Sequence, residues 1–259
     1  MEFDPGFALR AREDSLGFEY GEGVFGPTPE FRSLDTIRPS LKDPNCDGPD
    51  PVYGIVMDVG EDVDRADLER RMMLFGAVAY PAGRLGTEPV RSQGHVHHVS
   101  PHCGWSTPEL FEIWDGRAII YMQESTSDDP GRCIAISAGR GEVVVVPPGW
   151  AHAVINADPG KCMVFGAWCD RQYGFVYDGV RAHHGLAHFP VLGERDELTW
   201  EANPRYSRSE LHPRSARAYP ELGVTRGVPI YRRYKNNPEA LNWVSDPGRL
   251  AGLWKSFEP

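Results

Sequence analysis

The sequence has no paired cysteine motif and no long hydrophobic run, and each absence excludes a class of protein. The five cysteines are an odd number without a CxxC pair: Cys46, Cys103, Cys133, Cys162 and Cys169. This pattern is typical of reduced thiols, most of which act as small core residues. No stretch of about 18 apolar residues is available to cross a bilayer.

The chain also has few basic residues. Its 27 Lys and Arg stand against 37 Asp and Glu, which gives a net charge of −10. Nucleic acid needs a basic surface, so we expect no nucleic-acid partner. Residues Met1 to Pro5 do not have the basic and then apolar character of a signal peptide. We therefore expect a cytoplasmic protein with no membrane partner.

Turn-forming residues are abundant, with 28 Gly and 23 Pro among 259 residues. They separate short apolar runs at even spacing, which is typical of an all-β sandwich or barrel. We predict strands over these runs: Val52 to Val59, Met72 to Tyr80, Val90 to His97, Leu110 to Trp114, Ala118 to Met122, Ile134 to Ser137, Val143 to Val146, His152 to Ile155 and Met163 to Trp168.

The texture of the chain changes twice, so we predict three segments. Residues 1–50 are rich in Gly, Pro and charge and are interpreted as an N-terminal arm. Residues 51–190 form the barrel. Residues 191–259 form a C-terminal extension that packs on the barrel or on a partner subunit, with short helices near Pro238 to Val244 and Arg249 to Phe257.

The strongest local signal for chemistry is Gly94-His95-Val96-His97. Residues two apart on a strand project from the same face, so His95 and His97 point their imidazoles at one place. Two neutral imidazoles that converge in this way favour a metal site.

A second motif has the form G-x5-P-x-G-x2-H-x3-N and runs from Gly141 to Asn156. A buried strand is followed by a tight turn, and the returning strand carries His152 inward. These residues resemble the second sequence motif of the cupin superfamily at every fixed position. The resemblance implies a single cupin jelly-roll barrel.

Glu109 lies seven residues before Gly116, as in the E-x6-G half of the first cupin motif. Glu112 is the competing carboxylate, but its odd strand offset from Glu109 turns it to the other face. Eleven residues separate His97 from Glu109, more than the motif normally has. We interpret Val99 to Pro108 as an enlarged loop at the mouth of the barrel. Three imidazoles and one carboxylate suit one divalent metal per subunit, Fe²⁺, Mn²⁺, Zn²⁺ or Ni²⁺.

The chain resembles the cupin-type (archaeal-type) glucose-6-phosphate isomerases from about Pro51 to Tyr206. The family pattern T-x-G-H-x-H, then E-V-Y, a Gly, a Gln and PPxWAH-x-x-x-N is matched in several pieces. The matching residues are Asp50-Pro51-Val52-Tyr53, Tyr80-Pro81, Ser92 to His97, Glu109 to Glu112, Gly116, Gln123, Val146 to His152, Tyr173-Gly174 and Asn203 to Tyr206.

The resemblance implies a homodimer that interconverts glucose 6-phosphate and fructose 6-phosphate. It implies His95, His97, Glu109 and His152 as metal ligands. Glu109 is the candidate base, and Tyr173 or a metal-bound hydroxide is the alternative. The remaining substrate contacts that we predict are Tyr53, Ser92, Gly94 and Arg171. Arg171, Arg91 and Ser92 are the candidate phosphate donors.

Four positions depart from the family pattern: Phe111, Trp168, Arg171 and Ser92. The loss of two tyrosines among them favours one rival interpretation, a sugar-binding cupin without turnover. A second rival is a cupin dioxygenase, which would hold Fe²⁺ with the same ligands in a more apolar cavity.

Overall fold

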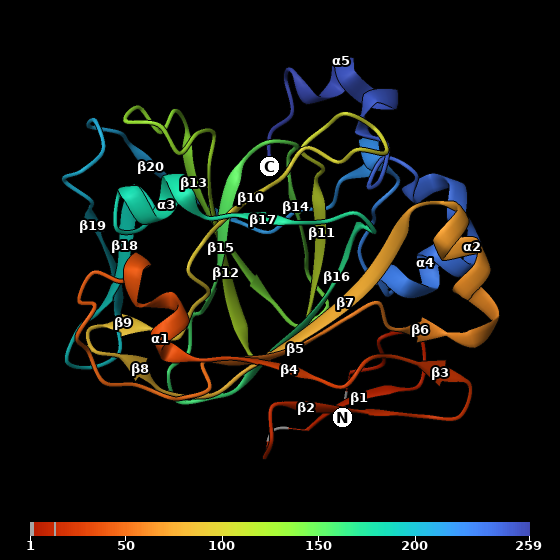
Figure 1. The fold of residues 1–259 in the computed structure, drawn as a ribbon, viewed down its shortest axis with the longest axis horizontal. Coiled ribbons are helices and arrows are strands. Elements are labelled where there is room, and N and C mark those ends of the chain that lie inside the picture. The colour runs from red at the N-terminus through yellow and green to blue at the C-terminus, as the bar shows by residue number, and fades with distance from the viewer. Residues whose placement is uncertain (1–2, 13) are drawn as a thin grey trace.

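The computed structural model describes residues 3–12 and 14–259. The start of the predicted arm, including the first two residues of the segment considered as a signal peptide, lies outside the described residues. Two β-sheets form the body of the molecule (Figure 1). Every strand pair in them is antiparallel except the pair of β13 and β20.

The larger sheet has six strands in the order β14-β11-β16-β7-β5-β4. Both of its faces are covered, which explains why several of its strands are apolar at nearly every position. The strands are β14 (Val143–Val146), β11 (Glu109–Asp115), β16 (Met163–Asp170), β7 (Met73–Tyr80), β5 (Tyr53–Met57) and β4 (Glu30–Arg32).

The smaller sheet has four strands in the order β15-β12-β13-β20. Its inner face packs against the larger sheet through residues such as Ile120 and Ile134. The strands are β15 (Ala151–Asn156), β12 (Arg117–Gln123), β13 (Cys133–Gly139) and β20 (Leu211–Ser215).

Five two-stranded sheets and a few short helices complete the described chain. The paired strands are β1 (Leu9–Arg12) with β2 (Gly17–Tyr20), β3 (Val24–Phe25) with β6 (Gly60–Glu61), β8 (Arg84–Leu85) with β9 (Glu88–Pro89), β10 (Val96–His97) with β17 (Phe175–Val176), and β18 (His188–Leu192) with β19 (Leu198–Ala202). The α-helices are α1 (Leu34–Ile37), α2 (Arg65–Arg70), α3 (Asp178–Ala182), α4 (Ile230–Asn236) and α5 (Ala251–Trp254), and 3₁₀ turns cover Arg38–Ser40, Asp62–Asp64, Pro220–Leu222, Pro238–Leu241 and Pro247–Leu250.

Alternation along β16 divides the core into two layers. Phe165 and Cys169 face the space between the two sheets. Trp168 faces the opposite way, where its ring stacks on Tyr231 of α4 and its Nε1 donates to the carbonyl of Ile230 at 3.0 Å. The C-terminal segment thus covers the outer face of the larger sheet, as the blue ribbon beside β16 and β7 shows (Figure 1).

Both ends of the chain add strands to the body of the molecule. Strand β4 pairs with β5, and β20 pairs in parallel with β13. The division into arm, barrel and extension stays a prediction. The all-β class with short helices is confirmed, and the two facing sheets fit the cupin fold.

The predicted strands correspond to observed ones with one exception. The run Val90 to His97 is not one regular strand, because Gly94 has φ of +86° and interrupts the extended backbone. The segment still pairs along β15 through isolated bridges and ends in β10. Helix α4 was not predicted. No helix within the described residues is long and apolar enough to cross a membrane.

Candidate metal centre and active site

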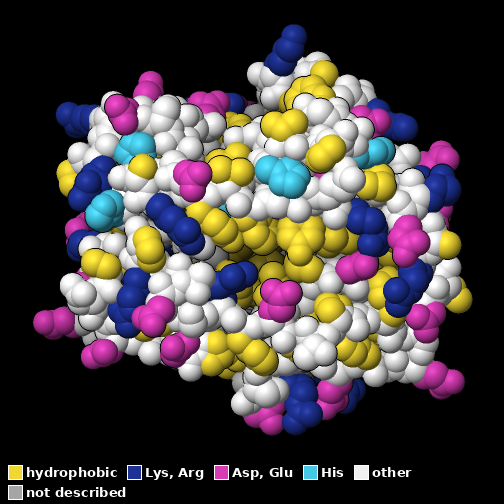
Figure 2. All heavy atoms as spheres, in the orientation of Figure 1, with side chains coloured by type: hydrophobic (Ala, Val, Ile, Leu, Met, Phe, Trp, Pro, Cys, Tyr) yellow, Lys and Arg dark blue, Asp and Glu magenta, His cyan; other side chains and the backbone are white. Residues whose placement is uncertain are grey.

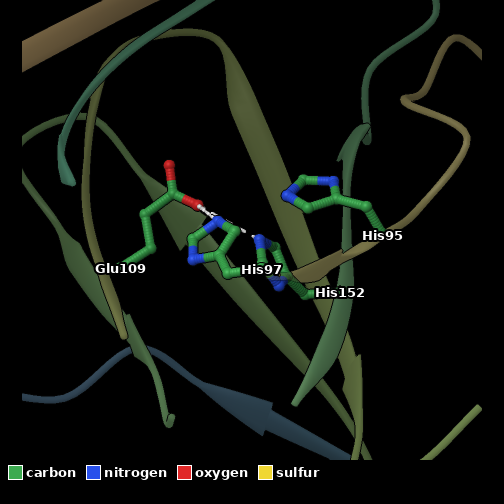
Figure 3. A group of neighbouring side chains, drawn as sticks. All are labelled: His95, His97, Glu109 and His152. Atoms are coloured by element: carbon green, nitrogen blue, oxygen red, sulfur yellow. Dashed lines mark hydrogen bonds and ion pairs between the residues drawn. The ribbon is translucent and has the colours of Figure 1, made fainter. Parts of the chain in front are cut away.

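Four side chains with metal-binding donors converge between the two sheets. One ligand atom from each of His95, His97, Glu109 and His152 lies within 4.8 Å of every other one. Figure 3 shows the three imidazoles and the carboxylate turned toward one another. Three of the four side chains are buried, and His95 is half-buried. The fold therefore brings together the four residues that the sequence motifs single out.

Backbone pairing explains this convergence. His95 and His152 form an antiparallel bridge, in which each amide nitrogen donates to the other residue's carbonyl at 3.0 and 2.9 Å. Glu109 begins β11 opposite Val146, the last residue of β14. The tight turn after Val146 then returns the chain into β15, so His152 and Glu109 enter from facing sheets.

The geometry of the donors fits a cation. His152 Nε2 lies 3.1 Å from Glu109 Oε2, and His97 Nε2 lies 3.3 Å from the same oxygen. The Nε2 atoms of His95 and His97 are buried and have no hydrogen-bond partner. Buried polar atoms are normally satisfied, so these unpaired nitrogens fit a divalent metal of the borderline type that imidazole and carboxylate prefer.

The enlarged loop after His97 orients that ligand. His97 Nδ1 lies 2.8 Å from the carbonyl of Thr107, and Ser106 Oγ donates to the carbonyl of His97 at 2.6 Å. A hydrogen bond at Nδ1 fixes the tautomer that leaves Nε2 free for a metal. The residues between His97 and Glu109 therefore form a loop that folds back on the site.

The electrostatics of the cluster favour the metal-binding forms of His95 and Glu109, whereas burial of His97 is outweighed by its contact with Glu109, so that the pKa of His97 is raised. Burial and the neighbouring imidazoles of His152 and His97 lower the pKa of His95 well below its usual value, so this ring is neutral. Burial alone would raise the pKa of Glu109, but the imidazoles of His152 and His97 beside its carboxylate outweigh burial and lower the pKa. The carboxylate is ionised throughout the physiological range.

Sequence reasoning missed Cys169 as a contact of the site. Its buried Sγ donates to Glu109 Oε1 at 3.2 Å. Burial and the charge of Glu109 raise the pKa of this thiol well above its usual range, so it remains a donor. The inward position of Cys169 on β16 was the available signal, since residues of that strand alternate between the two layers.

Glu112 lies on the opposite face of β11 from Glu109. Its Oε2 accepts from Trp114 Nε1 at 3.2 Å, and its Oε1 accepts from the amide of Ile230 at 3.3 Å. It is therefore part of the contact between the larger sheet and the C-terminal segment. Burial of a side chain that is 2% exposed raises its pKa to about 7.

This raised pKa predicts a pH dependence of stability. The ordinary pKa of the group is 4.5, so as pH rises from 4.5 to 7 the unfolded chain ionises while the folded protein keeps the proton. Folding stability falls across this window by about 3 kcal/mol. Glu112→Gln cannot ionise, so its free energy of unfolding relative to wild type should rise by that amount between pH 5 and 8. Urea titrations of both proteins measure the difference, and a pH-independent difference would contradict the assignment.

Three members of the metal-binding cluster, His95, Glu109 and His152, line a cavity between the two sheets. Figure 2 shows hydrophobic side chains gathered in the hollow at the centre of this face, with basic side chains beside them. Residues of both sheets and of the segment around β17 line the cavity: Arg32, Tyr53, Ile55, Met57, Gly76, Val78, Tyr80, Ser92, Gln93, Gly94, His95, Glu109, Phe111, His152, Val154, Phe165, Ala167, Phe175 and Tyr177.

Three of the predicted substrate contacts line this cavity, namely Tyr53, Ser92 and Gly94. Arg171 does not line it, and its guanidinium forms a two-pronged ion pair with Asp58 at 2.7 and 2.8 Å. Tyr173 is half-buried beside Phe175 and is also not among the lining residues. The roles assigned to these residues stay predictions.

Other departures from the expected pattern are explained by position. Phe111 lines the cavity, whereas Trp168 faces the outer layer and cannot affect it directly. His98 lies against Gly174, where a Cβ atom would come within 2.0 Å of His98 Nδ1, and it is not in the metal-binding cluster. Phe175 and Tyr177, which sequence reasoning did not select, complete the wall next to His95, with ring centroids 4.3 and 6.1 Å from that imidazole.

Comparison with known proteins adds to this geometry. The family model for glucose-6-phosphate isomerase (GPI) matches residues 41–206, more than half of the chain. The chain belongs to the glucose-6-phosphate isomerase family. The glucose-6-phosphate isomerase of Thermococcus gammatolerans is 27% identical over 145 residues, covering 56% of this chain and 70% of the relative. That of Pyrococcus furiosus is 28% identical over 159 residues, covering 61% and 75%.

Membership of this isomerase family favours an isomerase over the dioxygenase and the non-catalytic alternatives.

Solved structures are less similar. An oxalate oxidase aligns at 15% identity with a TM-score of 0.34, covering 48% of this chain and 54% of that one. A 7S globulin from Momordica charantia aligns at 12% identity with a TM-score of 0.34, covering 71% and 38%. Likeness at this level says nothing of the reaction.

Proposed function

We propose that this protein is a metal-dependent aldose-ketose isomerase that interconverts glucose 6-phosphate and fructose 6-phosphate in the cavity beside His95. The observation that carries the proposal is the convergence of three imidazoles and one carboxylate, three of which line that cavity, in a chain of the glucose-6-phosphate isomerase family.

His95, His97, Glu109 and His152 would hold one divalent metal per subunit, Fe²⁺, Mn²⁺, Zn²⁺ or Ni²⁺. When bound, such a metal polarises the oxygens at C1 and C2 of the sugar and so acidifies the adjacent C–H bonds. The chain's own residues orient the substrate. Tyr53 and Ser92 present hydroxyl groups along the cavity wall, and Gly94 lets the backbone approach closely because it has no side chain.

Isomerisation moves a proton between C2 and C1 through a cis-enediol, while a second proton moves between the two oxygens. Glu109 is the base that we favour, because it lines the cavity whereas Tyr173 does not. Its lowered pKa makes it a weak base, so transfer relies on the acidified C–H bond. Cys169 holds one carboxylate oxygen in place by its hydrogen bond. Phe111, Phe165 and Phe175 limit the access of water to the reacting carbons.

A coupled assay tests the reaction. Purified protein is supplied with fructose 6-phosphate, and glucose 6-phosphate is detected by its dehydrogenase. We expect turnover without oxygen consumption. Oxygen uptake without isomerisation would favour the dioxygenase, and neither reaction with a metal-loaded protein would favour the non-catalytic cupin.

We also propose a homodimer. The exposed Phe31, with 53% of its surface accessible, lies on β4 at the edge of the larger sheet, which offers apolar surface for a second subunit. Light scattering at micromolar concentration should give twice the chain mass of 28.9 kDa. A monomeric mass would remove this proposal.

A further inference from the structure

We propose that Arg32 is a specificity-determining residue that binds the phosphate group of the substrate at the wall of the cavity. The inference rests on the proposed function and adds a residue that the sequence motifs do not contain. Arg32 also precedes residues 41–206, the segment that matches the isomerase family.

The first argument is charge. Arg32 is the only lysine or arginine among the residues that line the cavity in the described part of the chain. No carboxylate of the described residues forms an ion pair with it, unlike Arg171 and Arg91, whose guanidinium groups pair with Asp58 and Glu88. A half-buried guanidinium without a carboxylate partner among the described residues is unusual in a chain of net charge −10 and is suited to an anion.

The second argument is hydrogen bonding. The Nε atom of Arg32 is buried and has no partner, and neither has the Nε2 amide of Gln93, a residue that is 2% exposed. Gln93 Oε1 accepts from Arg181 Nε at 3.2 Å and from Ser40 Oγ at 3.5 Å, which turns the amide so that its donor remains free. Both residues line the cavity, and each has one buried donor atom without an acceptor. A phosphate group supplies only acceptors at neutral pH, apart from a single proton in its monoanion.

The third argument is position. Arg32 is opposite Tyr53 in the pairing of β4 with β5, and its guanidinium carbon lies 6.0 Å from the centroid of that ring. His95, Glu109 and His152 of the metal-binding cluster line the same cavity, and so do Ser92 and Gly94. A sugar phosphate placed with its carbonyl end at the cluster can thus direct its phosphate toward Arg32.

Steady-state kinetics of Arg32→Ala test the inference. We expect the KM for fructose 6-phosphate to rise about 10-fold or more, because a charge-assisted hydrogen bond is lost. The inhibition constant of inorganic phosphate should rise by a similar factor. Arg32→Lys keeps the charge but not the planar fork and should fall between wild type and Arg32→Ala.

Arg117→Ala is the matched control. Arg117 is an exposed arginine at the start of β12. The residue that pairs with His152, Met122, lies near the opposite end of that strand. Its KM and phosphate inhibition should equal those of wild type. Unchanged constants in Arg32→Ala, with circular dichroism and metal content like wild type, would overturn the inference. If Arg32→Ala fails to fold, Arg32→Lys decides in the same way.

Calorimetric titration of the metal-loaded proteins with inorganic phosphate separates this inference from the proposed function. Phosphate binding by wild type that weakens in Arg32→Ala supports an anion site even if fructose 6-phosphate is not turned over. Turnover by wild type together with equal phosphate affinity in both proteins contradicts the role of Arg32 and leaves the proposed function intact. Absence of phosphate binding to wild type also overturns the inference.

Discussion

Alanine at His95, His97 or His152 is expected to strip the metal and reduce isomerase turnover to background while the two sheets stay folded. Each imidazole supplies one donor of a four-donor set, so its loss leaves an incomplete coordination shell. Mutation of a residue that only hydrogen-bonds to a metal ligand lowers metal affinity about 10- to 100-fold, and loss of the ligand itself should lower it more. Metal analysis, the coupled assay and circular dichroism measure the three quantities.

The control for these variants is His102→Ala. His102 is exposed in the loop between β10 and β11 and is not part of the metal-binding cluster. Its metal content and turnover should match those of wild type. Full metal content in two of the three ligand variants would refute the site.

Glu109→Gln and Glu112→Gln should have opposite outcomes although the two residues lie three apart on β11. Glu109→Gln keeps the size of the side chain but removes the anionic oxygen that faces His97 and His152. We expect metal affinity to fall by about 10-fold or more and most turnover to be lost. Glu112→Gln should keep metal and activity close to wild type, because its carboxyl group contacts Trp114 and Ile230 on the other face.

Metal titration of the two purified variants, followed by the coupled assay, makes the comparison. Loss of metal in Glu112→Gln with retention in Glu109→Gln would mean that the register of β11 differs from the one described. Equal losses in both variants would point to a general defect of the strand, which thermal unfolding would reveal.

The metal-binding cluster could be predicted from sequence because its signals are local. The two-residue spacing of His95 and His97 and the E-x6-G spacing of Glu109 both follow from strand alternation. The same alternation predicted that Glu109, and not Glu112, faces the metal site. The tight turn after Val146 determines the position of His152 on the next strand. The site could therefore be predicted despite the long loop between His97 and Glu109.

The wall of the cavity could not be predicted in the same way, because it depends on contacts between distant segments. Arg32 reaches the cavity only because β4 pairs with β5 at the edge of the larger sheet. Arg171 was predicted as a phosphate donor from its residue type, but its bonds to Asp58 depend on the path of the loop after β5. Helix α4 was missed because its helical character depends on packing of Tyr231 and Tyr234 against Trp168.

The most direct test of the central claim is isomerase turnover as a function of bound metal. Protein stripped by a chelator is titrated with one divalent metal at a time, and conversion of fructose 6-phosphate to glucose 6-phosphate is recorded at each step. We predict that turnover is absent in the stripped protein, rises with bound metal and saturates near one equivalent per chain. Turnover that is undiminished in the metal-free protein, or absent at full occupancy for every metal tried, would contradict the account.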